Sequence, residues 1–173
     1  MPRPRTTGKA GKPTFRYEAV GLVRSPFKTP EEIPVERNAD PRGFDDVRGK
    51  LVIDPACARG LKDIDGFSHL FVLFAFHRAG EAKLLSRPPF DTEPRGVFAS
   101  RSPRRPNALG LTIVKLESRR GRVLHVSGLD MIDGTPILDI KPYTDRDRRR
   151  GARTGWLARY RRRAAGRGRK GAA

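Results

Sequence analysis

Short runs of apolar residues, separated by turn residues, recur along the middle of the chain and predict a protein made mainly of β-strands. The strongest run, 67–77, is rich in aromatic and β-branched residues, and apolar side chains occupy both faces of the strand it would form. Such a strand is typical of the buried centre of a sheet. Two further runs, 109–116 and 121–128, flank Arg119-Arg120-Gly121, which predicts a hairpin turn.

Weaker patterns add the remaining elements. A partly alternating stretch at 15–23 predicts a first strand, which ends at Ser25-Pro26 because proline cannot donate a hydrogen bond to a neighbouring strand. The segment 28–48 contains four Pro or Gly residues and many charges, so we expect a long irregular loop. Short strands are expected at 50–53, 96–100 and 136–140, a brief helix at 55–64, and the start of a helix at 155–160.

These elements indicate the fold class. About six or seven short, evenly spaced strands with turn signals between them predict a sandwich or a barrel. Strands do not alternate with helices of 10–15 residues, which argues against a doubly wound α/β sheet. A length of 173 residues suits one domain with additional arms.

Charge divides the chain into three parts. The formal net charge is +18, of which 17–144 contributes only +3. Residues 1–16 carry five basic side chains and no acidic one, and 145–173 carry twelve basic and two acidic side chains. We therefore expect a basic disordered arm at 1–16, a folded domain at 17–144, and a basic tail at 145–173. Such ends neutralise phosphates without reading sequence, although an anionic membrane surface and a merely solubilising tail are alternatives.

Several classes of protein are disfavoured. The single cysteine, Cys57, excludes an internal disulfide framework and a cysteine-cluster metal site, and it is compatible with a reducing cytoplasm. The three histidines lack the spacing of a metal motif, so we expect no metal. The longest apolar stretch, 70–76, is far shorter than the roughly 20 residues of a membrane span, so we expect no membrane insertion.

Two segments carry candidate chemistry. The segment 101–110 holds three arginines and two prolines, which would fix cationic donors for a phosphate or a carboxylate; a charged hairpin loop without a partner is the alternative. The segment 129–143 places three aspartates, Lys141 and Tyr143 around an Asp-Gly-Thr-Pro turn, and could equally be a plain hairpin turn. His77 ends the strongest strand, at a rim that ligands can reach.

Read together, four segments resemble the TsaA-like (YaeB-like) family in the same order along the chain. They are Gly21-Leu-Val-Arg-Ser-Pro26, the run 66–77, the signature Gly96-Val-Phe-Ala-Ser-Arg-Ser-Pro-Arg-Arg-Pro-Asn-Ala-Leu-Gly-Leu111, and Asp133-Gly-Thr-Pro-Ile-Leu-Asp-Ile-Lys-Pro-Tyr143. The resemblance covers roughly 17–144. It implies a methyltransferase that uses S-adenosyl-L-methionine (SAM), is built on a single small β-barrel with short helices and long loops, and works as a homodimer.

The resemblance also implies the residues that contact the cofactor. They are Pro34, Val35, Glu36, His77, Arg78, Arg101, Leu109, Leu129, Asp130, Met131, Ile132 and Asp133. One departure concerns the first three, because Pro34-Val35-Glu36 stands where the family has Pro-Arg-Gln.

Members of the family that act on tRNA methylate N6 of threonylcarbamoyladenosine beside the anticodon, so the resemblance implies tRNA as a partner. For that reaction we expect Asp133, with Lys141 and Tyr143 nearby in sequence, to assist proton removal, and Arg104, Arg105 and Asn107 to bind the substrate. A methyltransferase acting on a small molecule and a non-catalytic module that binds SAM or RNA are the alternatives.

Overall fold

The computed structural model describes residues 6–7, 13–34, 37, 43–88 and 91–158. In this part of the chain the regular structure consists of β-strands and short 3₁₀ helices, so the expectation of a mainly β protein is confirmed. No helix among these residues is long and apolar enough to cross a membrane.

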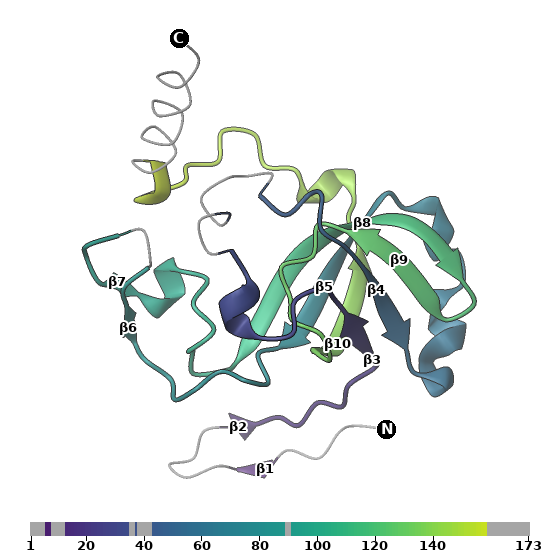
Figure 1. The fold of residues 1–173 in the computed structure, drawn as a ribbon, viewed down its shortest axis with the longest axis horizontal. Coiled ribbons are helices and arrows are strands. Elements are labelled where there is room, and N and C mark those ends of the chain that lie inside the picture. The colour runs from purple at the N-terminus through teal and green to yellow at the C-terminus, as the bar shows by residue number, and fades with distance from the viewer. Residues whose placement is uncertain (1–5, 8–12, 35–36, 38–42, 89–90, 159–173) are drawn as a thin grey trace.

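Six strands form a closed antiparallel ring (Figure 1). The order around the ring is β10-β3-β4-β9-β8-β5, and β5 pairs with β10 to complete it. The strands are β3 Gly21–Arg24, β4 Arg48–Ile53, β5 His69–Ala75, β8 Leu109–Arg120, β9 Val123–Ser127 and β10 Pro136–Pro142.

Smaller elements decorate the ring. Two-residue strands form two short pairs, β1 Thr6–Thr7 with β2 Pro13–Thr14, and β6 Leu85–Ser86 with β7 Arg95–Gly96. The 3₁₀ helices are η1 Pro30–Glu32, η3 Pro55–Leu61, η4 Ile64–Gly66, η5 Val97–Ala99 and η6 Asp145–Asp147.

Two expected strands differ from the structure. The first begins at Gly21 rather than at 15, and the strand expected at 96–100 is wrong. Only Gly96 belongs to β7, after which the chain turns into η5 and buries the Val97 side chain. The Val97 amide N–H donates to the Leu84 carbonyl (2.8 Å), in the register of the β6–β7 pair, and the 3₁₀ turn follows directly.

The core fills the inside of the ring. Along β5 the side chains alternate, with Leu70, Val72 and Phe74 buried inside and Phe71 and Leu73 half-buried outside. Burial on both faces was therefore the wrong expectation for this strand. The ring is a single layer, and among the described residues the outer face of β5 is covered only in part, by Tyr143 against Phe71.

Antiparallel pairing brings one set of strand ends together. Going around the ring, β3, β9 and β5 end at the side where β4, β8 and β10 begin. We call this side the loop end. It is covered by the long connections 25–47, 76–108 and 128–135, whereas the other end carries 54–68, the β8–β9 turn, and the chain after β10.

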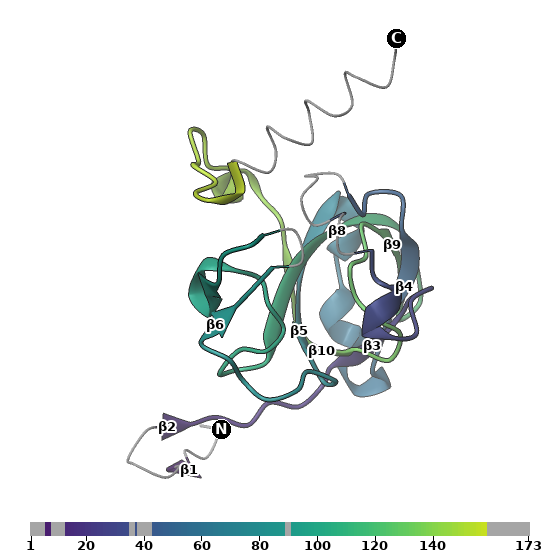
Figure 2. The same ribbon diagram turned by 60° about the vertical axis from the view of Figure 1, so that its left-hand side comes forward.

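The C-terminal segment folds back onto the connection between β5 and β8 (Figure 2). The Trp156 indole N–H donates to the Ala99 carbonyl (2.8 Å), and the Arg95 guanidinium lies 5.4 Å from the centre of the Trp156 ring. Arg95 also donates to the buried Asp91 carboxylate (2.7 Å). The chain after β10 is thereby fastened two residues before Arg101.

A substitution of Gly110, at the start of β8, tests the packing inside the ring. Its cross-strand partner is Phe74, whose ring lies where an alanine Cβ would project. We expect Gly110→Ala to lower the free energy of unfolding by about 1–3 kcal/mol, because overpacking forces the ring from its place.

Denaturant unfolding measures this effect. Gly96→Ala is the matched control, because its Cβ would meet no atom within 4 Å and its φ of −58° suits alanine. Equal midpoints for the two variants would contradict the packing argument.

Candidate functional site

The loop end gathers most of the residues that the sequence singled out. His77 and Arg78 follow β5, Arg101 lies in the connection before β8, and Asp130 and Asp133 follow β9. These segments are distant in sequence, and the closed ring brings them to one rim.

Asp133 ties two connections of the loop end together. Its amide N–H donates to the Phe27 carbonyl (2.7 Å), and its Oδ1 accepts from the Ser25 amide N–H (3.0 Å). Its Oδ2 lies 3.2 Å from Lys28 Nζ and 3.7 Å from Arg24 Nη1.

These contacts set the protonation of Asp133. Partial burial would raise the pKa of its carboxyl, but the Ser25 N–H and the Lys28 and Arg24 cations outweigh it, so the pKa lies below its ordinary value. A carboxylate held so firmly in its charged form is a weak proton acceptor. Its geometry suits the positioning of the 25–28 segment rather than the proton removal expected from the sequence.

Asp130 has the opposite environment. Its Oδ1 is buried and has no hydrogen-bond partner among the described residues. Burial raises the pKa of the Asp130 carboxyl, against the opposing effects of a hydrogen bond from the Thr112 hydroxyl and of the Arg101 charge. An unpartnered buried carboxyl oxygen is costly, and a water or a bound ligand can supply the missing donor.

The three arginines of the segment 101–110 differ in their contacts. Arg105 Nη1 donates to the carbonyls of Ser100 (3.2 Å) and Ser102 (3.3 Å), so this guanidinium holds the loop together. Arg101 and Arg104 are exposed, and no carboxylate forms an ion pair with either within the described residues. Two of the three expected donors are thus available to an anion.

The residues after β9 that were expected to contact the cofactor differ in the burial and chemistry of their side chains. Leu129, Met131 and Ile132 bury their side chains, and the first two belong to the core of the ring. Only their backbone groups could contact a ligand, whereas Asp130 offers a side chain.

The other expected residues lie around the rim or outside the described residues. His77 is exposed, and Arg78 Nη1 donates to the Lys28 carbonyl (3.1 Å). Leu109 and Asn107 are exposed, and Pro34 is half-buried. Val35 and Glu36 fall outside the described residues.

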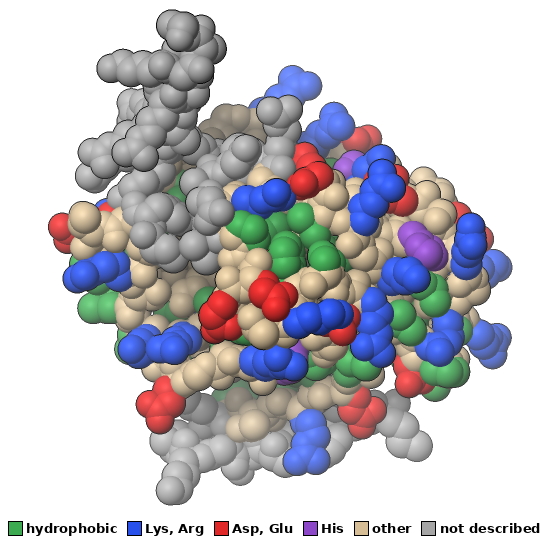
Figure 3. All heavy atoms as spheres, viewed as in Figure 1, with side chains coloured by type: hydrophobic (Ala, Val, Ile, Leu, Met, Phe, Trp, Pro, Cys, Tyr) green, Lys and Arg blue, Asp and Glu red, His purple; other side chains and the backbone are tan. Residues whose placement is uncertain are grey.

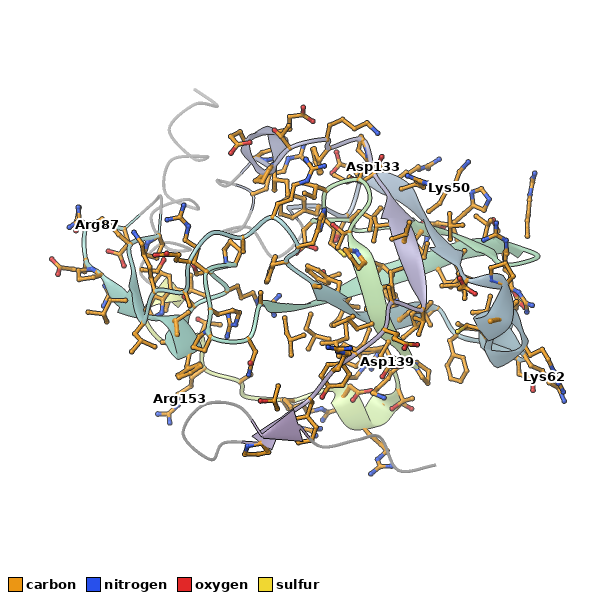
Figure 4. The ribbon with its side chains drawn as sticks, turned by 90° about the horizontal axis from the view of Figure 1, so that it is seen from below. Lys50, Lys62, Arg87, Asp133, Asp139 and Arg153 are labelled. Atoms are coloured by element: carbon orange, nitrogen blue, oxygen red, sulfur yellow. The ribbon has the colours of Figure 1, made fainter. Side chains whose placement is uncertain are left out.

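Lys141 and Tyr143 lie at the other end of β10 from Asp133, so these three residues do not form the cluster expected from the sequence. Figure 4 shows Asp133 beyond one end of this strand and Asp139 farther along it. Lys141 pairs with Asp139 (2.6 Å), and the Tyr143 ring packs 5.4 Å from the Phe71 ring. The five residue steps from Pro136 to Lys141 along β10 span about 17 Å, which explains why neighbours in sequence are separated here.

Sequence reasoning missed Thr112 and Lys28. Thr112 is a buried polar residue between the inward positions Gly110 and Val114, so strict alternation along β8 could have identified it. Lys28 carries no comparable signal, because only the folded connection brings it to Asp133. Among the described residues no group of three or more His, Cys, Asp or Glu side chains could hold a metal ion.

Comparisons with known proteins identify the family of the chain. Residues 22–147 match the family model described as the tRNA-methyltransferase O N-terminal domain. A protein of Pyrococcus abyssi named a probable S-adenosyl-L-methionine-binding protein is 42% identical over 142 residues, which cover 82% of this chain and 75% of that protein.

Longer relatives match over part of their length. The tRNA (adenine(37)-N6)-methyltransferase of Escherichia coli is 37% identical over 140 residues, which cover 75% of this chain and 58% of that enzyme. A crystal structure of TrmO superposes with a TM-score of 0.66 at 36% identity, covering 82% of this chain and 64% of that one. The chain thus spans less than two-thirds of these two proteins.

The buried Asp130 carboxyl predicts a pH-dependent change in stability. A carboxyl whose pKa is raised on folding contributes stability that is present at acidic pH and lost as pH rises through its folded pKa. We therefore expect Asp130→Asn, which cannot ionise, to be more stable than the parent at neutral pH. The advantage should shrink as the pH falls toward the unfolded pKa of about 4.

Thermal unfolding of the ligand-free protein between pH 4 and 8 measures this difference. Glu18→Gln removes an exposed carboxyl and serves as the control, with no pH-dependent gain expected. An advantage of Asp130→Asn that grew as pH fell would refute the assignment of burial as the dominant effect.

Proposed function

Because the chain belongs to the tRNA-methyltransferase O N-terminal domain family, we propose that it transfers a methyl group from SAM to tRNA. The observation that carries this proposal is the buried, unpartnered Oδ1 of Asp130 beside Thr112 and the exposed Arg101. The closed ring serves as a β-barrel platform within 17–144, and the chemistry takes place at its loop end.

The residues present fit the cofactor. SAM carries an ammonium, a carboxylate and ribose hydroxyls, so it offers both donors and an anion. Asp130 would accept a hydrogen bond from a donor of the cofactor, and Arg101 would bind its carboxylate. Thr112 and Arg101 already contact or face Asp130, so these groups hold it before the ligand arrives.

The proposed target is N6 of the adenine beside the anticodon, in its threonylcarbamoyl form. The name of the Escherichia coli relative refers to adenine 37, and a base in a single-stranded loop can be splayed out for reaction. The threonyl group adds a carboxylate that needs a cation. Arg104 supports this role better than Arg105, because Arg105 is already bonded to two carbonyls of its own loop.

The chain's contribution to the reaction is mainly positioning. SAM supplies the reactive methyl group when it is bound. Asp133 holds the 25–28 segment against the connection after β9, and Arg78 links this segment to the end of β5. Holding two reactants at one rim converts an encounter of separate molecules into a step between neighbours.

We further propose that the basic tail supplies RNA affinity. Residues 159–173 contain seven Lys or Arg and no acidic residue. Trp156, three residues before this segment, donates to the Ala99 carbonyl, two residues from Arg101. Uniform phosphate contacts of this kind strengthen binding without changing the chemical step. We also propose that the reaction takes place in the cytoplasm, with its tRNA substrate.

An exposed apolar face supports a homodimer. Leu109, Leu111 and Ile113 project from the outside of β8 with 36%, 53% and 45% of their surface exposed. Their cross-strand neighbours on β5 include Leu73 and Phe71, so the apolar surface is continuous across two strands. Monomers rarely expose such patches, and a twofold axis would let the same patch cover itself.

Cofactor binding tests the proposed site. We expect the protein to bind SAM with a micromolar dissociation constant, about 7–8 kcal/mol. Arg101→Ala and Asp130→Asn should each weaken binding about 10- to 100-fold, because each removes a charge-assisted hydrogen bond.

Titration calorimetry makes this measurement. Arg59→Ala, an exposed arginine of η3 at the other end of the ring, should bind as the parent does. If the parent gives neither heat nor a thermal shift at millimolar SAM, the proposed function fails.

Ile113→Glu tests the dimer. A charge in the middle of the apolar face should separate the subunits, so light scattering should give twice 19.3 kDa for the parent and 19.3 kDa for the variant. Arg120→Glu changes an exposed residue of the same strand outside this face and should stay dimeric. A parent mass of 19.3 kDa at micromolar concentration would exclude the dimer.

A further inference from the structure

The outer surface of β3, β4 and β9 carries a row of cations. Arg24 pairs with Lys50 in the register of β3 and β4, and Lys50 pairs with His125 in the register of β4 and β9. Their sequence neighbours Leu51 and Leu124 are buried, so alternation turns this row outward. Neighbouring strands are about 4.8 Å apart, which places the three side chains within roughly 10 Å.

The charge of this surface is poorly balanced. Three further exposed cations are Arg48 at the start of β4, Arg122 just before β9, and Arg120 at the end of the neighbouring strand β8. Within the described residues, Lys50, Arg120 and Arg122 form no ion pair, and Arg122 donates only to the Ile53 carbonyl (2.8 Å). Figure 3 shows Lys and Arg side chains, with a histidine among them, gathered over β4 and β9.

Acidic groups at the edges of this surface neutralise only part of its charge. Glu117 pairs with Lys115 (3.1 Å) and accepts from the Ser127 hydroxyl (2.8 Å). Asp133 pairs with Arg24 and with Lys28. The surface therefore presents a net positive charge to a partner.

A hollow of about 320 Å³ opens beside this row. Leu22 and Val52, cross-strand partners, form its apolar floor, and Leu22 is 39% exposed. Arg24, Arg122 and Asp54 stand around it. An apolar floor flanked by guanidinium groups suits the flat face of an unstacked base, and a carboxylate can accept from an exocyclic amine.

We propose that the outer face of β3, β4 and β9 binds a single-stranded segment of the RNA substrate, with phosphates on the Lys50 row and one base in the Leu22–Val52 hollow. The proposal rests on the proposed function, because it extends the path of the RNA away from the loop end. Arg24 joins the two regions, since it belongs to the row and lies 3.7 Å from Asp133.

RNA fits this surface better than other polyanions. An acidic protein segment or a phosphorylated headgroup would use the cations but leave the apolar hollow beside them unfilled. A nucleotide combines a phosphate with a flat ring, which matches the two features that lie side by side here.

The double variant Lys50→Gln/Arg122→Gln tests the row. Because two cations no longer neutralise phosphates in this variant, the slope of log affinity against log salt should fall by about 1.4, using the single-strand coefficient. If the parent and the variant bind tRNA equally at 1 M salt, this difference in slope makes the variant bind roughly 25-fold more weakly than the parent at 0.1 M salt.

The matched control is Arg59→Gln/Lys62→Gln. It removes the same two charges from another open depression, where Asp63 and Asp65 lie beside them. Fluorescence anisotropy with labelled tRNA should give the parent slope for this control. Thermal unfolding and SAM titration of both double variants should match the parent, so that a change in RNA affinity is not a folding defect.

Competition identifies the ligand. An unlabelled single-stranded RNA should displace tRNA from the parent more effectively than duplex RNA or polyphosphate of equal charge, and this preference should disappear in Lys50→Gln/Arg122→Gln. Equal competition by polyphosphate would refute a nucleotide site.

The two proposals fail in different ways. A parent that binds SAM but no tRNA would overturn the RNA substrate and this surface together. A parent that binds tRNA, with a double variant of unchanged affinity and slope, would overturn this surface alone.

Discussion

Closure of an antiparallel ring is the constraint on which the rest of this structure depends. Six is an even number, so strand directions can alternate all the way around, and the pairing of β5 with β10 leaves neither strand with an open edge. Alternation then brings three strand ends and three strand starts to one rim. The connections 25–47, 76–108 and 128–135 meet there, although they are far apart in sequence.

The same rim holds two carboxylates in opposite electrostatic environments. Two carboxylates only three residues apart receive opposite treatment, because Asp133 faces cations and a backbone N–H, while Asp130 is buried with one oxygen unpartnered. The first stabilises the connections that form the rim. Burial raises the pKa of the second carboxyl, because its charged form is disfavoured there.

The outer surface of the ring differs in character from one group of strands to another. The β5–β8 face is apolar and suits a second copy of the chain, whereas the β3–β4–β9 face is cationic and suits RNA. One closed sheet can hold both because each strand contributes alternate residues to a common core. The outward residues are then free to differ from one strand to the next.

The sequence by itself determined the mainly β class, the approximate positions of β5, β8 and β9, and the turn at Gly121, whose φ of +59° suits glycine. Local pattern also singled out the segments 101–110 and 129–143 and the basic ends, whereas the roles of Arg101 and Asp130 toward the cofactor came from the family resemblance and stay predictions. Only the tertiary structure decided that β10 closes onto β5, that Lys141 lies far from Asp133, and that Arg105 is held by its own loop. It alone set the opposite pKa directions of Asp130 and Asp133. The reason is physical: strand partners, burial and ion pairs arise between residues distant in sequence, so no local pattern encodes them.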